Sequence, residues 1–179
     1  KRQLPHWLQL DTRGGLDALR QTHPNSGKRH CRRRATRHTH DPTDPNELTS
    51  DLGWALYPIG FSSILEEAWT RYGKPIQILE NGIADAAQPD TLRQTFLVSH
   101  LREVWYAINV LGVDIDGYFH WSHLDNFEWA EGFGPRFGLF AVDYNNNFAR
   151  APRDSAGVYA EIIRNGISEE LWEAHRGPF

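Results

Sequence analysis

The chain has 179 residues, 40% of them hydrophobic, with seven Trp and a formal net charge of −4. This length allows one ordinary domain with a real core, but it excludes a complete eight-fold β/α barrel, which typically needs about 250 residues. No apolar run approaches the roughly 20 residues of a membrane span, so no membrane partner is expected. The single cysteine, Cys31, excludes an internal disulfide and favours a reducing, cytoplasmic location.

The charge is distributed unequally along the chain. Residues 1–45 contain ten Lys and Arg but only four acidic residues, whereas residues 46–179 contain nine basic and nineteen acidic residues. We therefore divide the chain into a basic segment, 1–45, and an acidic, well-patterned segment, 46–179. Lys1 and Arg2 are not followed by the apolar run of a signal peptide, and the chain contains no Met. A processed, trimmed or incomplete product is the expectation.

Three interpretations are open for residues 28–40, which contain six Lys or Arg and three His. So few apolar residues cannot offset the entropy of ordering, which favours a solvated or disordered tail. The charge alone would also suit contact with nucleic acid, although no aromatic residues are interleaved with it. The abrupt change of composition after residue 45 is consistent with a third hypothesis, in which this segment comes from a frame error, a fusion or a truncated gene.

From Leu48 onward, hydrophobic periodicity predicts alternating helices and strands. The first expected element is a helix that begins with a capping box at Ser63 and Glu66 and ends at Gly73. A strand from Pro75 to Leu79, a helix from Pro89 to Gly112 and a strand from Ile115 to Trp121 are expected next. A hairpin over 137–148 and a helix from Pro152 to Arg164 complete the expected order. This order is the alternation that builds a parallel sheet, so the predicted fold class is α/β.

Two segments carry the residues that suggest chemistry. Residues 78–82 read Ile-Leu-Glu-Asn-Gly and put a carboxylate, Glu80, where an apolar strand runs into an Asn-Gly turn. Residues 117–129 put a second carboxylate, Glu128, and two Trp just past the next strand. A carboxylate beside indole rings suits a site that cleaves sugars, because an indole face stacks on a pyranose ring. Glu-Asn-Gly alone would equally suit a surface Glu in an ordinary turn.

Together the two segments closely resemble the C-terminal part of family 1 glycoside hydrolases, the β-glucosidase family, over about residues 48–166. The resemblance implies that residues 46–179 form the last two strand–helix units of a (β/α)8 TIM barrel, with the active site at the carboxyl ends of the strands. It implies retaining hydrolysis of β-glucosides, with Glu80 as the nucleophile. Leu79 replaces the Thr that is commoner before this Glu. Residues 1–45 do not share the resemblance and are expected to be poorly ordered.

The resemblance also implies four substrate-binding residues. It places Trp121 under the sugar next to the cleaved bond, and it makes Glu128 and Trp129 a pair that recognises sugar hydroxyls. Phe137 matches a Phe near the same subsite. The alternatives are a core Trp at a strand end for Trp121 and a loop salt bridge for Glu128. His120 is expected to be a buried, hydrogen-bonded residue rather than a catalyst.

The acid/base Glu of the family has no counterpart here, because Asn46-Glu47 is followed by Leu48 and not by Pro. The isolated chain is therefore expected to have little or no activity unless another chain supplies the rest of the barrel. The expected partners are a β-glucoside or short β-linked oligosaccharide and such a second chain. No metal-ligand spacing, phosphate loop or dinucleotide fingerprint occurs, so neither a cofactor nor a metal is expected. The alternatives are a non-catalytic carbohydrate-binding fragment and a nucleic-acid-binding protein.

Overall fold

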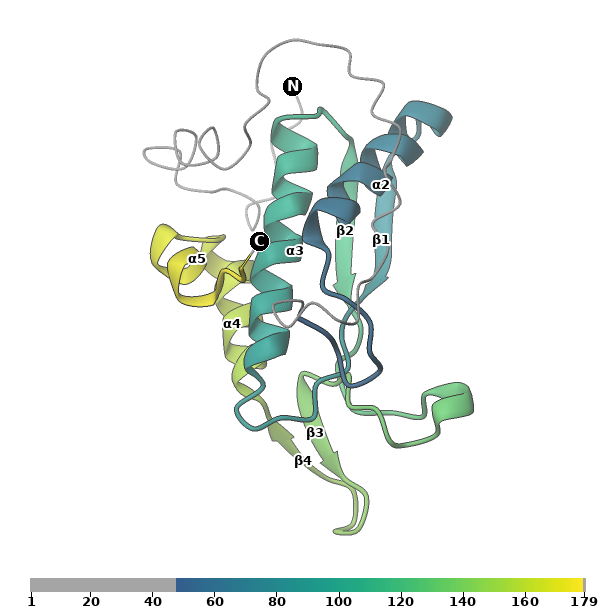
Figure 1. The fold of residues 1–179 in the computed structure, drawn as a ribbon, viewed down its shortest axis with the longest axis vertical. Coiled ribbons are helices and arrows are strands. Elements are labelled where there is room, and N and C mark those ends of the chain that lie inside the picture. The colour runs from purple at the N-terminus through teal and green to yellow at the C-terminus, as the bar shows by residue number, and fades with distance from the viewer. Residues whose placement is uncertain (1–47, 179) are drawn as a thin grey trace.

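The computed structural model describes residues 48–178. The predictions for the basic segment, 1–45, lie outside these residues. Two parallel strands, β1 (Ile76–Asn81) and β2 (Ile115–His120), pair side by side, and an antiparallel hairpin forms a second small sheet. Figure 1 shows this hairpin beyond the ends of β1 and β2, on the side to which both strand arrows point. The α/β class predicted from the order of elements is confirmed.

The first described helix, α2 (Pro58–Tyr72), has Tyr57 as its N-cap and so begins six residues earlier than the capping box at Ser63 predicted. Pro58 occupies the first helical position, where its fixed φ suits the helix and its missing N–H is no loss. Ser63 lies inside the helix and donates its hydroxyl to the Ile59 carbonyl at 2.9 Å, so its predicted role as a cap was wrong. Gly73 ends the helix as predicted, in the left-handed conformation with φ 56°.

The strand pair follows the predicted positions closely. Ile78 pairs with Tyr118, and Asn81 pairs with His120. Ile78, Ile115 and Tyr118 are buried under the helices. The opposite face carries Gln77, Leu79, Gly117 and Phe119, and two large apolar side chains are exposed there, Leu79 by 64% and Phe119 by 54%. Since parallel sheets are normally covered on both faces, this open apolar face is unusual.

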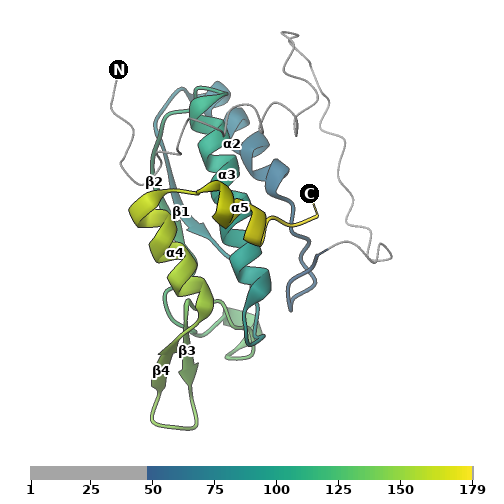
Figure 2. The ribbon, with the colours of Figure 1, turned by 90° about the vertical axis from the view of Figure 1, so that its left-hand side faces the viewer.

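The central helix, α3 (Thr91–Asn109), packs against α2, α4 and α5 as well as against the sheet (Figure 2). Pro89 precedes it by two residues, so the prediction that this proline lies in its first turn was wrong. The apolar spacing predicts a buried stripe, of which the structure buries Phe96, Leu97, Leu101, Val104 and Trp105, whereas Leu92, Ile108 and Leu111 are only half-buried. The helix buries polar residues on its remaining faces too. Two of these buried polar side chains have clear partners. The Ser99 hydroxyl donates to the Thr95 carbonyl at 2.7 Å, and the Arg102 guanidinium stacks over the ring of Trp172 at 4.0 Å.

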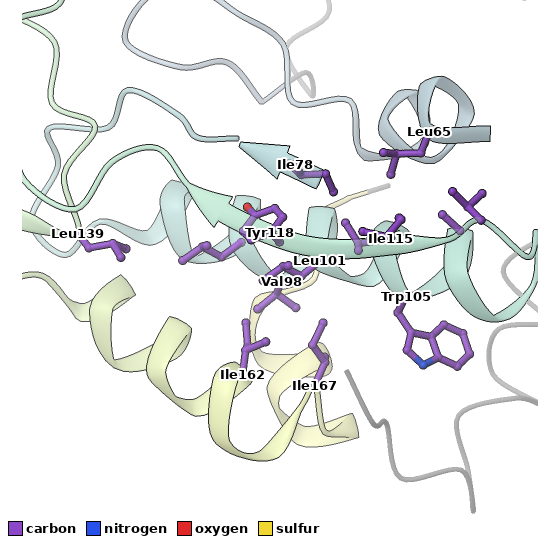
Figure 3. Packing of buried hydrophobic residues seen from close by; sticks show 14 residues of the cluster. Leu65, Ile78, Val98, Leu101, Trp105, Ile115, Tyr118, Leu139, Ile162 and Ile167 are labelled. Atoms are coloured by element: carbon purple, nitrogen blue, oxygen red, sulfur yellow. The ribbon is translucent and has the colours of Figure 1, made fainter. Parts of the chain in front are cut away.

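One hydrophobic core joins these elements (Figure 3). Its buried members are Leu65, Ile78, Leu97, Val98, Leu101, Val104, Trp105, Ala107, Val113, Ile115, Tyr118, Leu139, Ile162 and Ile167. A buried side chain of this kind contributes about 1.5–3 kcal/mol relative to an exposed one. The core therefore fixes α3 and α4 against the helix-covered face of β1 and β2.

After β2 comes a long loop that contains only the short 3-10 helix η2 (Trp129–Glu131). The hairpin follows as β3 (Phe140–Asp143) and β4 (Ala149–Pro152), a few residues later than predicted. Because Pro152 belongs to β4, the next helix, α4 (Asp154–Asn165), starts two residues later than expected. A final helix, α5 (Glu169–His175), was not predicted, although Ser168 caps it by accepting from the Leu171 N–H at 3.1 Å.

Candidate active site

The two sequence motifs meet at the carboxyl ends of β1 and β2. Glu80 is the fifth residue of β1, and Trp121 follows the last residue of β2. The backbone N–H of Trp121 donates to the Asn81 carbonyl at 3.0 Å, and the Asn81 side chain accepts from the Tyr118 hydroxyl at 2.9 Å. The ends of the two strands are thus tied together, as the parallel arrangement predicted.

Gly82, the last residue of Glu-Asn-Gly, explains why this motif needs a glycine. A Cβ atom at this position would lie 1.6 Å from the Trp121 carbonyl oxygen, far inside any allowed contact. Any side chain would force the two segments apart. The glycine therefore permits a close approach between the chain after Glu80 and the chain after β2, where the Trp121–Ser122 peptide bond is cis.

Trp121 and Glu128 are in direct contact. The indole Nε1–H of Trp121 donates to Glu128 Oε1 at 3.2 Å, across seven residues of the sequence. Glu128 forms no ion pair with any of residues 48–178, so a loop salt bridge is not what holds it there. A half-buried carboxylate next to a half-buried indole provides a charged acceptor beside a flat apolar surface.

Trp129 and Phe137, the other two predicted substrate-binding residues, differ from each other in their exposure to solvent. Trp129 opens η2 with φ 50° and is 81% exposed, so its ring is open to solvent in the described chain. Phe137 is buried, and its ring lies 6.1 Å from that of Trp54. Its backbone reaches the Trp121 segment, where the Phe137 carbonyl accepts from the Ser122 N–H at 3.1 Å.

Glu80 itself is exposed and lies within β1 rather than in a turn. The ordinary-turn alternative for its motif therefore does not describe its backbone. Leu79, which stands in place of the commoner Thr, points to the open face of the sheet and is 64% exposed. The pairing of β1 with β2 shifts register between Ile78 and Asn81, the stretch that contains Glu80.

His120 is enclosed as predicted, with its ring 5.9 Å from that of Tyr159. Among residues 48–178 neither ring nitrogen makes a hydrogen bond of good geometry, although an interaction with the Asn81 backbone opposes the lowering of the His120 pKa. Burial lowers the pKa of His120 to about 3, and the positive charge of Arg93 contributes to this lowering. The imidazole is therefore neutral at physiological pH, which is consistent with a structural rather than a catalytic residue.

Two residues near the site had no role in the sequence interpretation. Trp54 is 58% exposed beside Phe137, and Asp125 is buried between the loop and the hairpin. Trp54 stands before the first described helix in no recognisable motif, and Asp125 lies within residues 117–129, whose interpretation rests on Glu128 and the two Trp. Among residues 48–178, no cluster of His, Cys, Asp and Glu could hold a metal ion. No helix in the same range is long and apolar enough to cross a membrane.

Comparison with known proteins decides the family. The sequence pattern that defines glycosyl hydrolase family 1 matches residues 17–167. The chain belongs to glycosyl hydrolase family 1. The match extends upstream of the region, 48–166, in which the two motifs suggested the resemblance.

Relatives within glycosyl hydrolase family 1 include glycosidases of archaea and bacteria. The chain is 50% identical over 134 residues to a β-galactosidase of Sulfolobus acidocaldarius, covering 74% of this chain and 26% of that protein. Its structure is similar to that of a β-glycosidase from Pyrococcus horikoshii, with a TM-score of 0.69 and 48% identity over 75% of this chain and 31% of the other. A family 1 β-glucosidase from Thermotoga maritima, in complex with isofagomine lactam, gives a TM-score of 0.63 and 37% identity over 67% of this chain and 29% of that chain.

The chain thus spans about a quarter of the length of the curated relatives it matches. These relatives include both β-galactosidases and β-glucosidases. Family membership supports the fold and the hydrolase class of this chain.

Proposed function

We propose that this chain is the C-terminal part of a retaining β-glucosidase, with Glu80 as the nucleophile and with activity only when the rest of the barrel is supplied. In this proposal residues 46–179 form the last two strand–helix units, and residues 1–45 form a separate basic segment. The observation that carries the proposal is the hydrogen bond between Trp121 and Glu128 at the strand ends that also bear Glu80.

The open surfaces of the strand pair support a partial barrel. Within residues 48–178, neither outer edge of β1 and β2 carries another strand. Leu79 and Phe119 are exposed on the face that none of the helices in residues 48–178 covers. A groove of about 340 Å³ runs between β2 and α4, and Phe119, Tyr159 and Ile163 are among its lining residues. Further strands alongside β2 and β1 would fill this groove and cover this face.

The proposed chemistry assigns one covalent step to Glu80. A carboxylate oxygen of Glu80 attacks the anomeric carbon of the sugar, and the bond from that carbon to the leaving-group oxygen breaks. The leaving group takes the electron pair and needs a proton. A water molecule then attacks the same carbon, gives a proton to the acid/base group that the rest of the barrel would supply, and breaks the bond to the Glu80 oxygen, which yields a sugar with its original anomeric configuration.

The other site residues bind the sugar in this proposal. Trp121 offers an indole face for the sugar at the cleaved bond, while Glu128 accepts hydrogen bonds from sugar hydroxyls. Trp129 contributes one N–H donor, and Phe137 shapes the wall of the pocket near the same subsite. The Trp121 indole already donates to one oxygen of Glu128, which leaves the other oxygen available to a hydroxyl.

The isolated chain lacks the general acid that would protonate the leaving group. Loss of a general acid typically costs about 100- to 10,000-fold in rate. A glucoside with a leaving group that is stable as an anion, such as dinitrophenolate, does not need this proton. Such a substrate therefore separates the nucleophile from the missing acid.

The test is covalent labelling by dinitrophenyl 2-deoxy-2-fluoro-β-glucoside, alone and in a mixture with the complementary N-terminal portion of a family 1 relative. We expect a fluoroglucosyl adduct on the peptide that contains Glu80, found by mass spectrometry, and none in the Glu80→Gln variant. Labelling only in the mixture would support the split barrel. Absence of any adduct in a mixture that is shown to associate would overturn the role of Glu80.

A non-catalytic carbohydrate-binding fragment is the second candidate, and the exposed indole of Trp129 favours it. In that case isofagomine lactam would bind to the chain with no adduct forming at Glu80.

A variant that starts at residue 46 tests whether residues 1–45 are a separate segment. This test is needed because the family match begins at residue 17, inside that segment. The cytoplasmic location that the single Cys31 favours stays a prediction.

A further inference from the structure

The loop over residues 126–136 carries Glu128 and Trp129 but has little regular structure of its own. Its only helix is η2, three residues long. Inside the loop the Glu128 N–H donates to the Gly132 carbonyl at 2.7 Å, which closes a tight turn without tying it to the rest of the fold. Contacts within the loop also tie it to the fold: the Phe133 ring packs edge-to-face against Tyr144 at 4.9 Å, and Asn126 donates to Ser122 Oγ at 3.1 Å. The residues at the two ends of the loop add polar contacts that fix where it leaves and rejoins the fold.

Asp125, directly before the loop, has the densest set of polar contacts at these ends. Its Oδ1 accepts from the Gly138 N–H at 3.0 Å, and its Oδ2 accepts from the Val142 N–H at 3.1 Å. The carboxylate is 1% exposed. Burial alone would raise the pKa of Asp125, but hydrogen bonds from Arg153 and from these two backbone groups outweigh burial, so the pKa lies below its ordinary value.

Arg136, at the far end of the loop, lies 3.5 Å from the Asp125 carboxylate, but Arg153 provides the closer opposite charge. It donates through both terminal nitrogens to the two oxygens of Asp125, at 3.0 and 2.9 Å, and its side chain is only 4% exposed. The same guanidinium donates to the Gly138 carbonyl at 2.5 Å. Arg153 stands just before α4, so this bidentate pair links the start of the loop to a helix that the hydrophobic core holds in place.

Backbone bonds extend this connection to Trp121. Ser122 exchanges hydrogen bonds with Phe137 and Leu139, at 3.1 and 2.9 Å, so the residue after Trp121 is paired with the far end of the loop. The chains approach closely here, because a Cβ on Gly138 would lie 2.2 Å from the Asp125 nitrogen. The two ends of the loop thus run side by side, with the Asp125 carboxylate bonded to the far end.

We propose that Asp125, paired with Arg153, is a positioning residue that sets both ends of the 126–136 loop so that Glu128 stays within hydrogen-bonding distance of Trp121. The proposal rests on the proposed function only in treating Glu128 as a sugar ligand. An Asn side chain at position 125 keeps the shape but has one acceptor oxygen, so one of the two backbone N–H groups would face the amide –NH2, and Arg153 would lose its partner charge.

The test follows the indole N–H signal of Trp121 by two-dimensional NMR of the whole chain labelled with 15N-tryptophan. The chain has seven Trp, and the Trp121→Phe variant identifies the signal. Glu128→Ala gives its position without the hydrogen bond. We expect Asp125→Asn to move the Trp121 proton upfield by at least half of the shift that Glu128→Ala causes, while the buried Trp105 keeps its position. Arg153→Lys, which keeps the charge but loses the bidentate contact, should move it in the same direction by less.

The matched control is Glu103→Gln, which disturbs another buried carboxylate, one that accepts from Ser62 between α2 and α3. It should lower stability without moving the Trp121 signal. An unmoved Trp121 signal in Asp125→Asn would overturn the proposal, as would an equal movement in Glu103→Gln. If Asp125→Asn does not fold, an unmoved signal in Arg153→Lys would have the same force. The measurement needs neither turnover nor sugar, so failed labelling of Glu80 would not affect its outcome.

Discussion

Replacement of Asp90 by an asparagine should destabilise this chain strongly, because it leaves a buried positive charge without its partner. The Asp90 carboxylate and the Arg93 guanidinium are both 0% exposed and lie 2.6 Å apart. Arg93 also donates to the carbonyls of Asp85 and Arg136, each at 2.5 Å, so it cannot move out to solvent without breaking these bonds. The amide oxygen of the new side chain could still accept from the Ser155 N–H, as Asp90 does at 3.2 Å, so the change removes mainly the charge.

The expected magnitude follows from burial. Breaking a buried ion pair by removing one partner typically costs about 3–5 kcal/mol, whereas an exposed helical pair contributes about 0.3–0.5 kcal/mol. The chain contains a suitable exposed pair in Glu67 and Arg71, whose side chains are 63% and 62% exposed. Asp90→Asn should therefore lower the free energy of unfolding roughly tenfold more than Glu67→Gln does. Because small domains are stable by only about 5–15 kcal/mol, about a fifth or more of the stability is at stake.

Urea denaturation followed by tryptophan fluorescence measures this difference. With a slope of about 2 kcal/mol per molar urea, a loss of about 4 kcal/mol lowers the midpoint by about 2 M, and Glu67→Gln should shift it by less than about 0.3 M. Midpoints for the two variants within about 0.5 M of each other would refute the reasoning. Such a result would mean that Arg93 finds water or another acceptor once Asp90 loses its charge.

Three further predictions concern other parts of the molecule. Burial lowers the pKa of His100 to about 4, so the unfolded chain binds a proton first as the pH falls below about 6.5. This residue alone should lower the free energy of unfolding by about 2 kcal/mol from pH 7 to pH 5, in addition to a similar loss from His120, whose pKa is about 3. Denaturation at both pH values should therefore show a smaller drop in His100→Gln, and an equal drop would exclude this cause. In thermal melts, Gly138→Ala should lower stability by about 2 kcal/mol or more because its Cβ meets backbone, whereas Gly157→Ala, with open space in α4, should raise it by about 0.5–1 kcal/mol. Phe119→Asp should weaken association with the complementary barrel portion about tenfold or more, because it places a charge on the exposed apolar face. Hydrolysis rates on mixing the two portions measure this association, and unchanged rates would mean that the two portions do not meet at this face.

Much of the fold could be predicted because it depends on local periodicity. The apolar stripe of α3, with Leu97, Leu101 and Val104 among its members, recurs at helical spacing and is buried. The two strands were found because short apolar runs end at polar motifs. The start of α2 was misplaced because two local signals compete, a capping box at Ser63 and a proline at Pro58, and the proline determines where the helix begins.

The family, too, could be recognised from short strings, since Glu80 with its Asn-Gly and Glu128 with its flanking residues suffice for the resemblance. Parallel strands bring their carboxyl ends to one edge, so the meeting of the two motifs was also predictable. The sequence could not indicate that Glu128 turns back to accept from the indole of Trp121, because a long irregular loop has no periodicity to extrapolate.

The sequence by itself thus determined the elements, their α/β order and the family, because each depends on spacing between near neighbours. Only the tertiary structure decided which buried charges hold the site together. Arg153 meets Asp125 across 28 residues, and Asp90 accepts from the start of α4 across 65 residues. Such pairs follow no repeat in the sequence. They form where the folded chain brings a buried donor close to a buried acceptor. Once buried, each group would lose free energy of solvation without the other, so the two stabilise the fold only as a pair.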